Sequence, residues 1–186
     1  IEGALKTIAT EGYTENDALG FQVEMLRRFK PQVVVGHDAA GEYGHGTHII
    51  NSETLRDAVS AAADAEKFPY SAAQYGVWDT PKLYLHLWAE NEIVMDFDQP
   101  LEHFGGKTAY EMSNAGYECH VSQHWTWFTE WMRGTANAPI TKASQITKYS
   151  PCRYGLWRST VGADTKADFF DNIELYSIQQ AKQDAL

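Results

Sequence analysis

The chain has 186 residues and a mass of 20.9 kDa, a size that fits one domain or part of a larger one. Hydrophobic residues make up 44% and charged residues 22%, and no apolar stretch approaches the ~18 residues of a membrane span, so a spanning or disordered chain is excluded. Acidic residues number 25 against 15 basic ones, and the net charge of -10 would repel a polyanion. We therefore expect a globular chain that binds no nucleic acid.

Residues 14–30 predict an amphipathic helix, which Thr14 and Asp17 can cap and which Pro31 ends. Its apolar face would hold Leu19, Val23, Leu26 and Phe29. The β-branched run Val33–Val35 follows, and such a run is typical of a central strand that is covered on both faces in a parallel sheet. Helix and strand in this order predict an α/β fold.

The rest of the chain continues this alternation. The expected elements are a helix at 49–67, a strand at 82–88 with one apolar face, a short strand at 94–98, a helix from 107 to about 127, and a long surface excursion at 134–151. No internal repeat or composition shift indicates a domain boundary. In open α/β sheets ligands bind at the carboxyl ends of the strands, so the polar loop 36–48 is the first place to expect a site.

Loop residues 37–48 read HDAAGEYGHGTH and hold three histidines, an aspartate, a glutamate and a tyrosine. His45 and His48 are three residues apart at the start of a helix, so they can share one face. Neutral imidazoles there suit either a divalent metal or a developing negative charge. The alternative is a turn whose histidines only bond backbone carbonyls. The density of such groups at a strand end favours a functional site.

At this point the sequence resembles a known family. GEYGHGTH is similar to the second signature, GxxGHxxH, of the LmbE-like or PIG-L-type zinc-dependent N-acetylglucosaminyl deacetylases. Further segments that look like this family are KPQVVVGHD before the signature, KLYLH at 82–86, CHVSQ at 119–123, GLWRSTVGAD at 155–164 and DFFDNI at 168–173. The resemblance implies a Rossmann-like, mostly parallel α/β sheet with flanking helices. It also implies that residues 1–186 form the later portion of a single deacetylase-like domain.

Several site residues follow from the resemblance alone. It implies zinc, or another divalent metal, with His48 as a ligand and His45 as the group that stabilises the oxyanion or protonates the leaving amine. Tyr43 resembles a residue near the substrate carbonyl, and Asp38 matches an acidic position of several relatives. Gly46-Thr47 stands where many relatives have Pro-Asp, which leaves both histidines in register and bears on substrate preference.

The family's first signature, of HPDDE type, does not occur in the sequence. That signature supplies the other zinc ligands and the general base, and a single imidazole cannot hold catalytic zinc. We therefore expect a missing N-terminal segment or a companion chain to pack beside Val33–Val35 and complete the site. Without it, residues 1–186 should be neither stable nor active.

A second histidine motif is HVSQH at 120–124. It lacks the glutamate of an HExxH zinc motif, so a structural role is favoured, although the family's H-x-SQ element approaches the site and keeps His120 as a weaker candidate. Three nearby tryptophans are open to two interpretations, core packing or sugar stacking. They are Trp125, Trp127 and Trp131.

The sequence thus favours a hydrolase that removes an acetyl group from an N-acetylglucosamine-type sugar or glycoconjugate. Two alternatives remain: a catalytically inactive carbohydrate-binding relative, and an N-acyl hydrolase acting on a non-sugar substrate. The compartment is left open, because the visible chain shows no signal peptide and its two cysteines do not form a disulfide framework.

Overall fold

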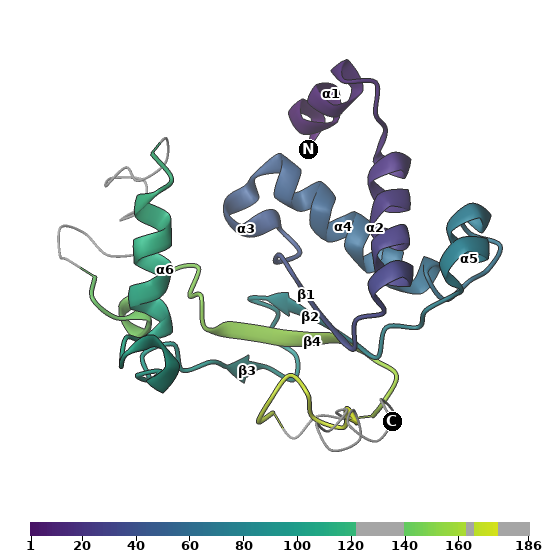
Figure 1. The fold of residues 1–186 in the computed structure, drawn as a ribbon. Helices are drawn as coiled ribbons and strands as arrows, with labels where there is room; N and C mark the ends of the chain where they lie inside the picture. The colour runs from purple at the N-terminus through teal and green to yellow at the C-terminus, as the bar shows by residue number, and fades with distance from the viewer. Residues whose placement is uncertain (122–139, 163–165, 175–186) are drawn as a thin grey trace.

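The computed structural model describes residues 1–121, 140–162 and 166–174 (Figure 1). The helices are α1 Glu2–Thr10, α2 Glu15–Phe29, α3 Gly41–Gly44, α4 Gly46–Ala61, α5 Pro69–Tyr75 and α6 Ala109–Glu118, with 3-10 turns η1 Glu102–Phe104 and η2 Ala143–Gln145. The strands are β1 Val33–Gly36, β2 Lys82–His86, β3 Ile93–Val94 and β4 Arg153–Ser159. No helix in these ranges is long and apolar enough to cross a membrane.

Helix α2 begins and ends where the sequence predicts. The Thr14 hydroxyl accepts from the Asp17 N–H, and the Asp17 carboxylate accepts from the Thr14 N–H in return, which satisfies two backbone donors at the first turn. The helix ends at Lys30 in the left-handed conformation, directly before Pro31. A few neighbouring residues at each end therefore determine where α2 begins and ends.

The four described strands form a mixed sheet in the order β1-β2-β4-β3. Only β1 and β2 run parallel, whereas β2 with β4 and β3 with β4 run antiparallel. The expectation of a mostly parallel sheet is therefore wrong for these strands. A helical crossover between β1 and β2 makes that pair parallel, but the chain returns to β4 after a long excursion, and its direction is not encoded in the strand's own residues.

Strand β1 lies at one edge of this sheet, and no other described strand pairs with its outer side. Val35 is 45% exposed, so the prediction of a central strand covered on both faces is wrong for the described part of the chain. A β-branched run shows that a strand forms, but burial of its two faces depends on neighbours that other segments supply.

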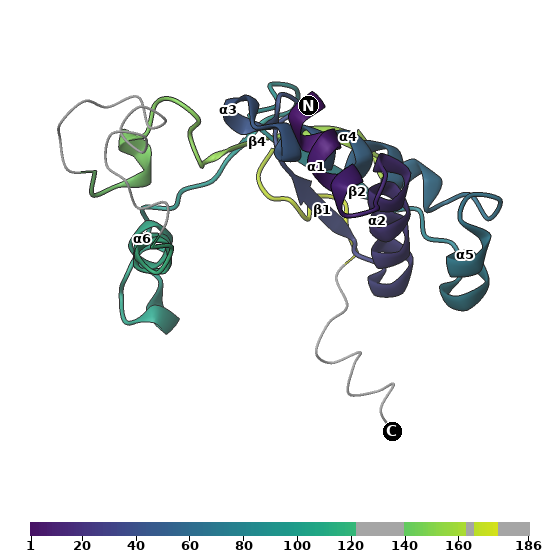
Figure 2. The same cartoon turned by 90° about the horizontal axis from the view of Figure 1, so that it is seen from above.

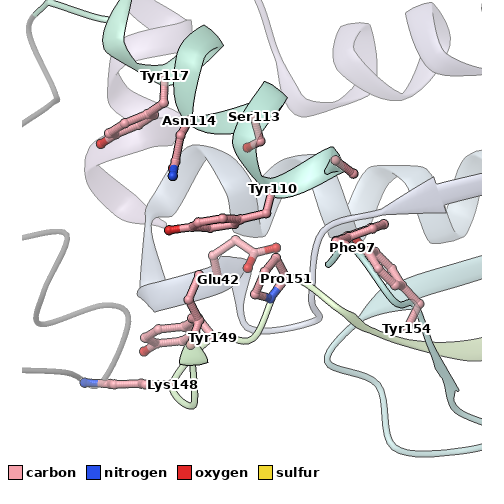
Figure 3. Close-up of a pocket in the computed structure, with 12 residues that line it drawn as sticks. Glu42, Phe97, Tyr110, Ser113, Asn114, Tyr117, Lys148, Tyr149, Pro151 and Tyr154 are labelled. Carbon is pink, nitrogen blue, oxygen red and sulfur yellow. The ribbon is translucent and has the colours of Figure 1, made fainter. Parts of the chain in front are cut away.

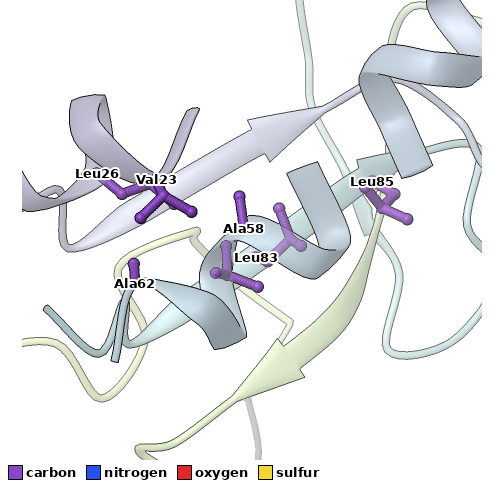
Figure 4. Close-up of a cluster of buried hydrophobic side chains, with 7 residues drawn as sticks. Val23, Leu26, Ala58, Ala62, Leu83 and Leu85 are labelled. Atoms are coloured by element: carbon purple, nitrogen blue, oxygen red, sulfur yellow. The ribbon is translucent and has the colours of Figure 1, made fainter. Parts of the chain in front are cut away.

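The main core lies between the sheet and the helices α2 and α4, which cover the same face (Figures 1 and 4). Its buried members are Val23, Leu26, Ala58, Val59, Ala62, Leu83 and Leu85. Leu83 and Leu85 face these helices because they are two apart on β2 and so share a side. This packing fixes the position of α4, and therefore of the histidine turn at its N-terminus.

Strand β2 has the predicted apolar face, formed by Leu83 and Leu85, and its other face is largely buried as well. Lys82 and Tyr84 alternate with the leucines, and both are fully buried. The Lys82 ammonium donates to the Tyr84 hydroxyl and to the Phe169 carbonyl, each at 3.4 Å. A long side chain that finds acceptors can therefore line the second buried face.

Other elements differ from expectation in their bounds. Helix α4 ends at Ala61 and not near 67, and β3 is only two residues long. The excursion expected over 134–151 is not purely a surface segment in its described part, because Ala143 and Ile146 are buried against Tyr110 of α6. Figure 2 shows α6 set apart from the helices α1 to α5, consistent with this separate small cluster.

Candidate functional site

The parallel pairing of β1 and β2 brings two histidines to the same edge of the sheet. Gly36 lies opposite Leu85 in this register, so His37 and His86 both occupy the carboxyl ends of their strands. This is the edge at which open α/β sheets bind ligands. The site is therefore built on the one parallel pair of the described sheet.

A strained turn leads from β1 to α4. Gly41 has a φ of 68°, and a Cβ there would lie 2.5 Å from the Ile49 nitrogen, so no larger residue fits. Glu42 follows at φ 59° and ψ -115°, a conformation that normally belongs to glycine and costs other residues about 1–3 kcal/mol. The chain reverses here, and His45 becomes the residue that begins α4.

Three imidazoles gather around the start of α4. The rings of His37 and His48 are stacked, with centroids 4.4 Å apart and an interplanar angle of 12°. His45 meets His48 edge-on at 4.6 Å, and Tyr43 meets His48 edge-on at 5.8 Å. His48 therefore lies at the centre of the cluster, while His45 is exposed at its rim.

His48 is held in its neutral form. Burial lowers the pKa of this imidazole, and the nearby His37 and His45 lower it further, against the opposing effect of Glu42 and Asp38. Its Nδ1 is buried without a hydrogen-bond partner in the described part of the protein. A neutral imidazole with an unused nitrogen is the form that binds a divalent metal.

Asp38 is buried beside this cluster, and its Oδ1 also lacks a hydrogen-bond partner among the described atoms. Burial, and then the charge of Glu42, raise the pKa of this carboxyl. Unsatisfied buried oxygens are rare in folded proteins and need an explanation, such as a ligand. Asp38 Oδ1 and His48 Nδ1 are thus an oxygen and a nitrogen of the kinds that bind a divalent cation, and they could provide part of its ligands.

These groups do not complete a metal centre. Across residues 1–121, 140–162 and 166–174, no three His, Cys, Asp or Glu side chains are arranged to hold one ion. Catalytic zinc needs about three protein ligands. His48 therefore fits the chemistry of a zinc ligand, but the described residues alone do not enclose the ion.

Glu42 and His86 form a partly buried ion pair behind the turn. The His86 Nδ1–H donates to Glu42 Oε2 at 2.6 Å, and its Nε2–H donates to the Ser150 carbonyl at 2.7 Å. Glu42 Oε1 lies 3.2 Å from His37 Nδ1 and accepts from the Asp38 N–H at 3.2 Å. One carboxylate thus joins the turn to both strand ends.

The pair is stabilised in its charged form. Burial alone would raise the pKa of Glu42, but the hydrogen bond and charge of His86, the Asp38 N–H and His37 together lower it to about 2. Burial would likewise lower the pKa of His86, and the bond and charge of Glu42 with the Ser150 carbonyl raise it instead. Each partner thus favours the charged form of the other, an imidazolium beside a carboxylate.

The predicted site residues fall into two groups. Asp38, Tyr43, His45 and His48 come together around the turn, and the Thr47 hydroxyl lies 2.8 Å from His45 Nδ1. His120 is exposed directly after α6 with its ring 6.3 Å from Tyr117, and none of the contacts just given for the cluster includes it. The tryptophans at 125, 127 and 131 lie outside the described residues.

A cavity of about 520 Å³ opens beside Glu42, between α6 and the segment that leads into β4. Figure 3 shows aromatic rings around it from both sides. The rings belong to Phe97, Tyr110, Tyr117, Tyr149 and Tyr154. Ser113 and Asn114 add polar groups at its wall. Aromatic faces with a few hydrogen-bonding groups suit a ring-shaped polar ligand, such as a sugar.

Sequence reasoning assigned no role to His37, Glu42 or His86. A signal for His86 was present, because it lies near the end of the strand predicted at 82–88, and the ends of parallel strands meet at one edge. Glu42 carried no such signal, since only the folded turn shows that its side chain reaches the next strand. The structure thus adds a supporting pair to the four residues at the turn.

The fold and the site together describe an α/β protein with a histidine turn at the carboxyl ends of two parallel strands, and part of its sequence is similar to named deacetylases and an amidase. The chain is 35% identical over 83 residues to a 1D-myo-inositol 2-acetamido-2-deoxy-alpha-D-glucopyranoside deacetylase 2 of Frankia casuarinae, a match that covers 45% of this chain and 26% of the relative. It is 39% identical over 69 residues to the protein of the same name in Saccharopolyspora erythraea, covering 37% of this chain and 24% of the relative.

A third relative is a mycothiol S-conjugate amidase of Streptomyces coelicolor, 40% identical over 68 residues, with 36% of this chain and 22% of the relative covered. The matches thus span about a quarter of the length of these curated relatives. No protein-family model matches the chain, and no solved structure gives a significant match. All three relatives are named for cleaving an amide bond.

Proposed function

We propose that this protein is a zinc-dependent amide hydrolase that removes an acetyl group from an N-acetylglucosamine-type sugar or glycoconjugate. The observation that carries the proposal is His48, a neutral imidazole with an unpartnered Nδ1 in a histidine turn at the carboxyl end of β1. The names of the matched relatives, two sugar deacetylases and an amidase, support the same reaction class.

His48 would hold the metal through one imidazole nitrogen, with zinc or another divalent ion in the site. When bound, zinc supplies Lewis acidity that makes attack of water on an amide carbonyl feasible near neutral pH. Asp38, with its unpartnered buried oxygen, is the acidic group of this chain nearest in role to that chemistry. Its carboxylate would orient a group bound to the metal or hold a proton beside the reacting atoms.

His45 would act on the reaction itself. It is exposed at the rim, where a substrate can reach its Nε2, while the Thr47 hydroxyl can hold Nδ1. A histidine held in this way can donate a hydrogen bond to the oxyanion or a proton to the leaving amine. Tyr43, edge-on to His48, would contact the substrate near its carbonyl. His120 remains a weaker proposed participant.

The remaining ligands and the general base would come from residues that the structure does not describe or from a segment or companion chain beyond these 186 residues. The outer edge of β1 offers a place for such a segment, because a strand added there would end beside His37 and the histidine turn. Catalysis would then need both parts of the site.

A second candidate function is carbohydrate binding without catalysis. The aromatic cavity beside Glu42 favours this alternative, since it would hold a sugar ring whether or not a metal is bound. A third is hydrolysis of a non-sugar N-acyl substrate, which the name of the amidase relative keeps open.

Acetate release by the full-length protein separates these candidates. We expect release from acetamido sugars, little from non-sugar N-acyl amides, and loss of activity with a chelator followed by recovery with zinc. Sugar binding without acetate release would favour the binding module instead. Faster release from non-sugar amides would favour the third candidate.

A further inference from the structure

Glu42 and His86 stand out because the proposed chemistry does not use them, yet they are the most strongly bonded charged groups at the site. Their side chains are only 14% and 13% exposed. They belong to different elements, the turn before α4 and the end of β2, and lie 44 residues apart in sequence. A buried pair of this kind needs a reason, because burial of two charges is costly unless geometry and hydrogen bonds compensate.

The protonation state of His86 follows from its partners. One ring nitrogen faces the Glu42 carboxylate, whose pKa is lowered to about 2 so that it carries no proton, and the other faces the Ser150 carbonyl, which can only accept. Both nitrogens must therefore donate, so the ring is an imidazolium. Both of its bonds are short, at 2.6 and 2.7 Å, as expected for charge-assisted hydrogen bonds.

The pair acts on the most strained point of the turn. Glu42 has a backbone conformation that suits glycine, and its carboxylate is anchored at the same time to β2 through His86 and to the end of β1 through His37 and the Asp38 N–H. Three residues later His45 begins α4. The anchor therefore fixes where the first turn of α4, with His45 and His48, stands relative to the sheet edge.

We propose that Glu42 and His86 are positioning residues for the catalytic turn: the anchored carboxylate holds the strained loop so that His45 and His48 keep the arrangement that the reaction needs. For its kinetic part the inference rests on the proposed function. The pair itself does not touch the reacting atoms. His37 contacts Glu42 through its Nδ1 and stacks on His48, so its ring links the position of the Glu42 carboxylate to that of the His48 imidazole.

Two substitutions separate positioning from simple folding. Glu42→Gln keeps the shape and the strain but loses the charge, whereas Glu42→Gly relieves the strain and loses the anchor. Glu92→Gln is the matched control, because it also removes an ion pair, to Arg153 at 2.8 Å, and Glu92 directly precedes β3, the strand at the opposite edge of the sheet from β1. A structural role alone predicts that the glycine variant recovers both stability and turnover.

In the full-length protein we expect kcat on acetamido sugars to fall on the order of 10- to 100-fold in both Glu42 variants with little change in KM, the range for residues that support a site. Glu42→Gly should be at least as stable as Glu42→Gln and yet no more active. Glu92→Gln should keep wild-type kcat. Wild-type kcat in either Glu42 variant would overturn the proposal.

A second readout does not depend on the reaction. Nitrogen NMR of the imidazoles should show two protonated nitrogens for His86 at neutral pH, and the His45 and His48 signals should move or broaden in both Glu42 variants but not in Glu92→Gln. Unchanged His45 and His48 signals would overturn positioning even in a protein without deacetylase activity. Absence of acetate release by the wild type, with these shifts present, would instead contradict only the proposed function.

Discussion

At the scale of residues, His45 and His48 lie three positions apart but are placed in different surroundings. His48 is partly buried at the centre of three imidazoles, whereas His45 is exposed with Thr47 at its Nδ1. One ring is thus suited to a metal and the other to a substrate. The difference is a property of the turn and of the stacking by His37, and not of the residue type.

Replacing His45 with Ala should therefore lower turnover without removing metal. We expect a loss on the order of 100- to 10,000-fold, the range for an oxyanion donor or general acid. Metal content by elemental analysis and kcat, measured on the same preparation, test this together. Loss of metal in the variant would show that the roles of the two histidines have been exchanged.

The Glu42–His86 pair makes a prediction about pH. The pKa of Glu42 is lowered from 4.5 to about 2, so its contribution to stability is fully present above about pH 4.5 and is lost as the pH falls toward 2. The pKa of His86 is raised from 6.5, so its contribution is fully present below pH 6.5 and is lost as the pH rises through the folded value.

The unfolding free energy of the wild type should therefore fall at low and at high pH relative to that of Glu42→Gln. In this variant both pH-dependent contributions, from Glu42 and from His86, are weakened. Denaturant unfolding at pH 3, 6 and 9 measures the difference. The Glu92→Gln control should follow the wild type. A constant difference between wild type and Glu42→Gln at all three pH values would contradict the assignment of the ion pair.

How much of the site the sequence predicts depends on how local each signal is. Thr14 and Asp17 predict a helix start because capping involves residues three apart. The HDAAGEYGHGTH loop predicts the cluster because its histidines, aspartate and tyrosine are also close together in the sequence. The bonds of Glu42 to His86 and of His86 to Ser150 join residues 44 and 64 apart, and no spacing rule reveals them before the fold is known.

At the scale of elements, α2 is joined to the end of α4 by one buried arginine. The Arg27 guanidinium is fully buried and donates to backbone carbonyls in the segment that ends α4, as well as to the Ser71 hydroxyl. The carbonyls belong to Ala61, Ala62, Asp64, Lys67 and Phe68. Arg27 thus supplies donors to carbonyls at and beyond Ala61, where α4 ends and carbonyls lose their helical partners.

Arg27→Met should destabilise the protein by about 3 kcal/mol or more, since it removes six hydrogen bonds of one buried charged group, and hydrogen bonds to charged groups contribute about 1.5–3 kcal/mol each. The neighbouring Arg28 is exposed over the Phe29 ring, so Arg28→Met is a matched control with an expected change within about 0.5 kcal/mol. Denaturant unfolding of both variants measures this. Equal losses would show that Arg27 does not hold the helix end.

The mixed sheet shows why strand direction was not predicted. The alternation at 82–88 correctly indicates a strand, but Leu83 and Leu85 face the helices while Lys82 and Tyr84 are buried on the other side. The direction of β4 depends on the path of the long segment between β3 and β4, and the residues of the strands themselves do not determine that path. Pairing of distant segments therefore limits what local patterns can predict.

At the scale of the whole molecule, the outer edge of β1, with which no other described strand pairs, predicts a pairing partner. In a parallel strand, alternate amides point to opposite sides, so β2 can bond only half of the amides of Val33–Gly36. In residues 1–186 expressed alone, the outward amides should exchange with solvent fast, and stability should be low. In the full-length protein both sets should be protected.

Hydrogen exchange followed residue by residue through β1 measures this alternation. The inward amides, bonded to β2, serve as the internal control. Fast exchange of the outward amides in the full-length protein would contradict the proposed partner strand. Cooperative unfolding, zinc binding and deacetylation by residues 1–186 alone would contradict the need for any further segment.

The role of His48 as a metal ligand is tested by the metal content of the full-length protein with His48 replaced by Ala. His48 is the imidazole with the lowered pKa and, among the described atoms, the unpartnered buried nitrogen, so we expect about one zinc per chain in the wild type and in His45→Ala, and loss of tightly bound metal in His48→Ala. Acetate release should disappear together with the metal. Unchanged metal content in a folded His48→Ala variant would contradict the central claim.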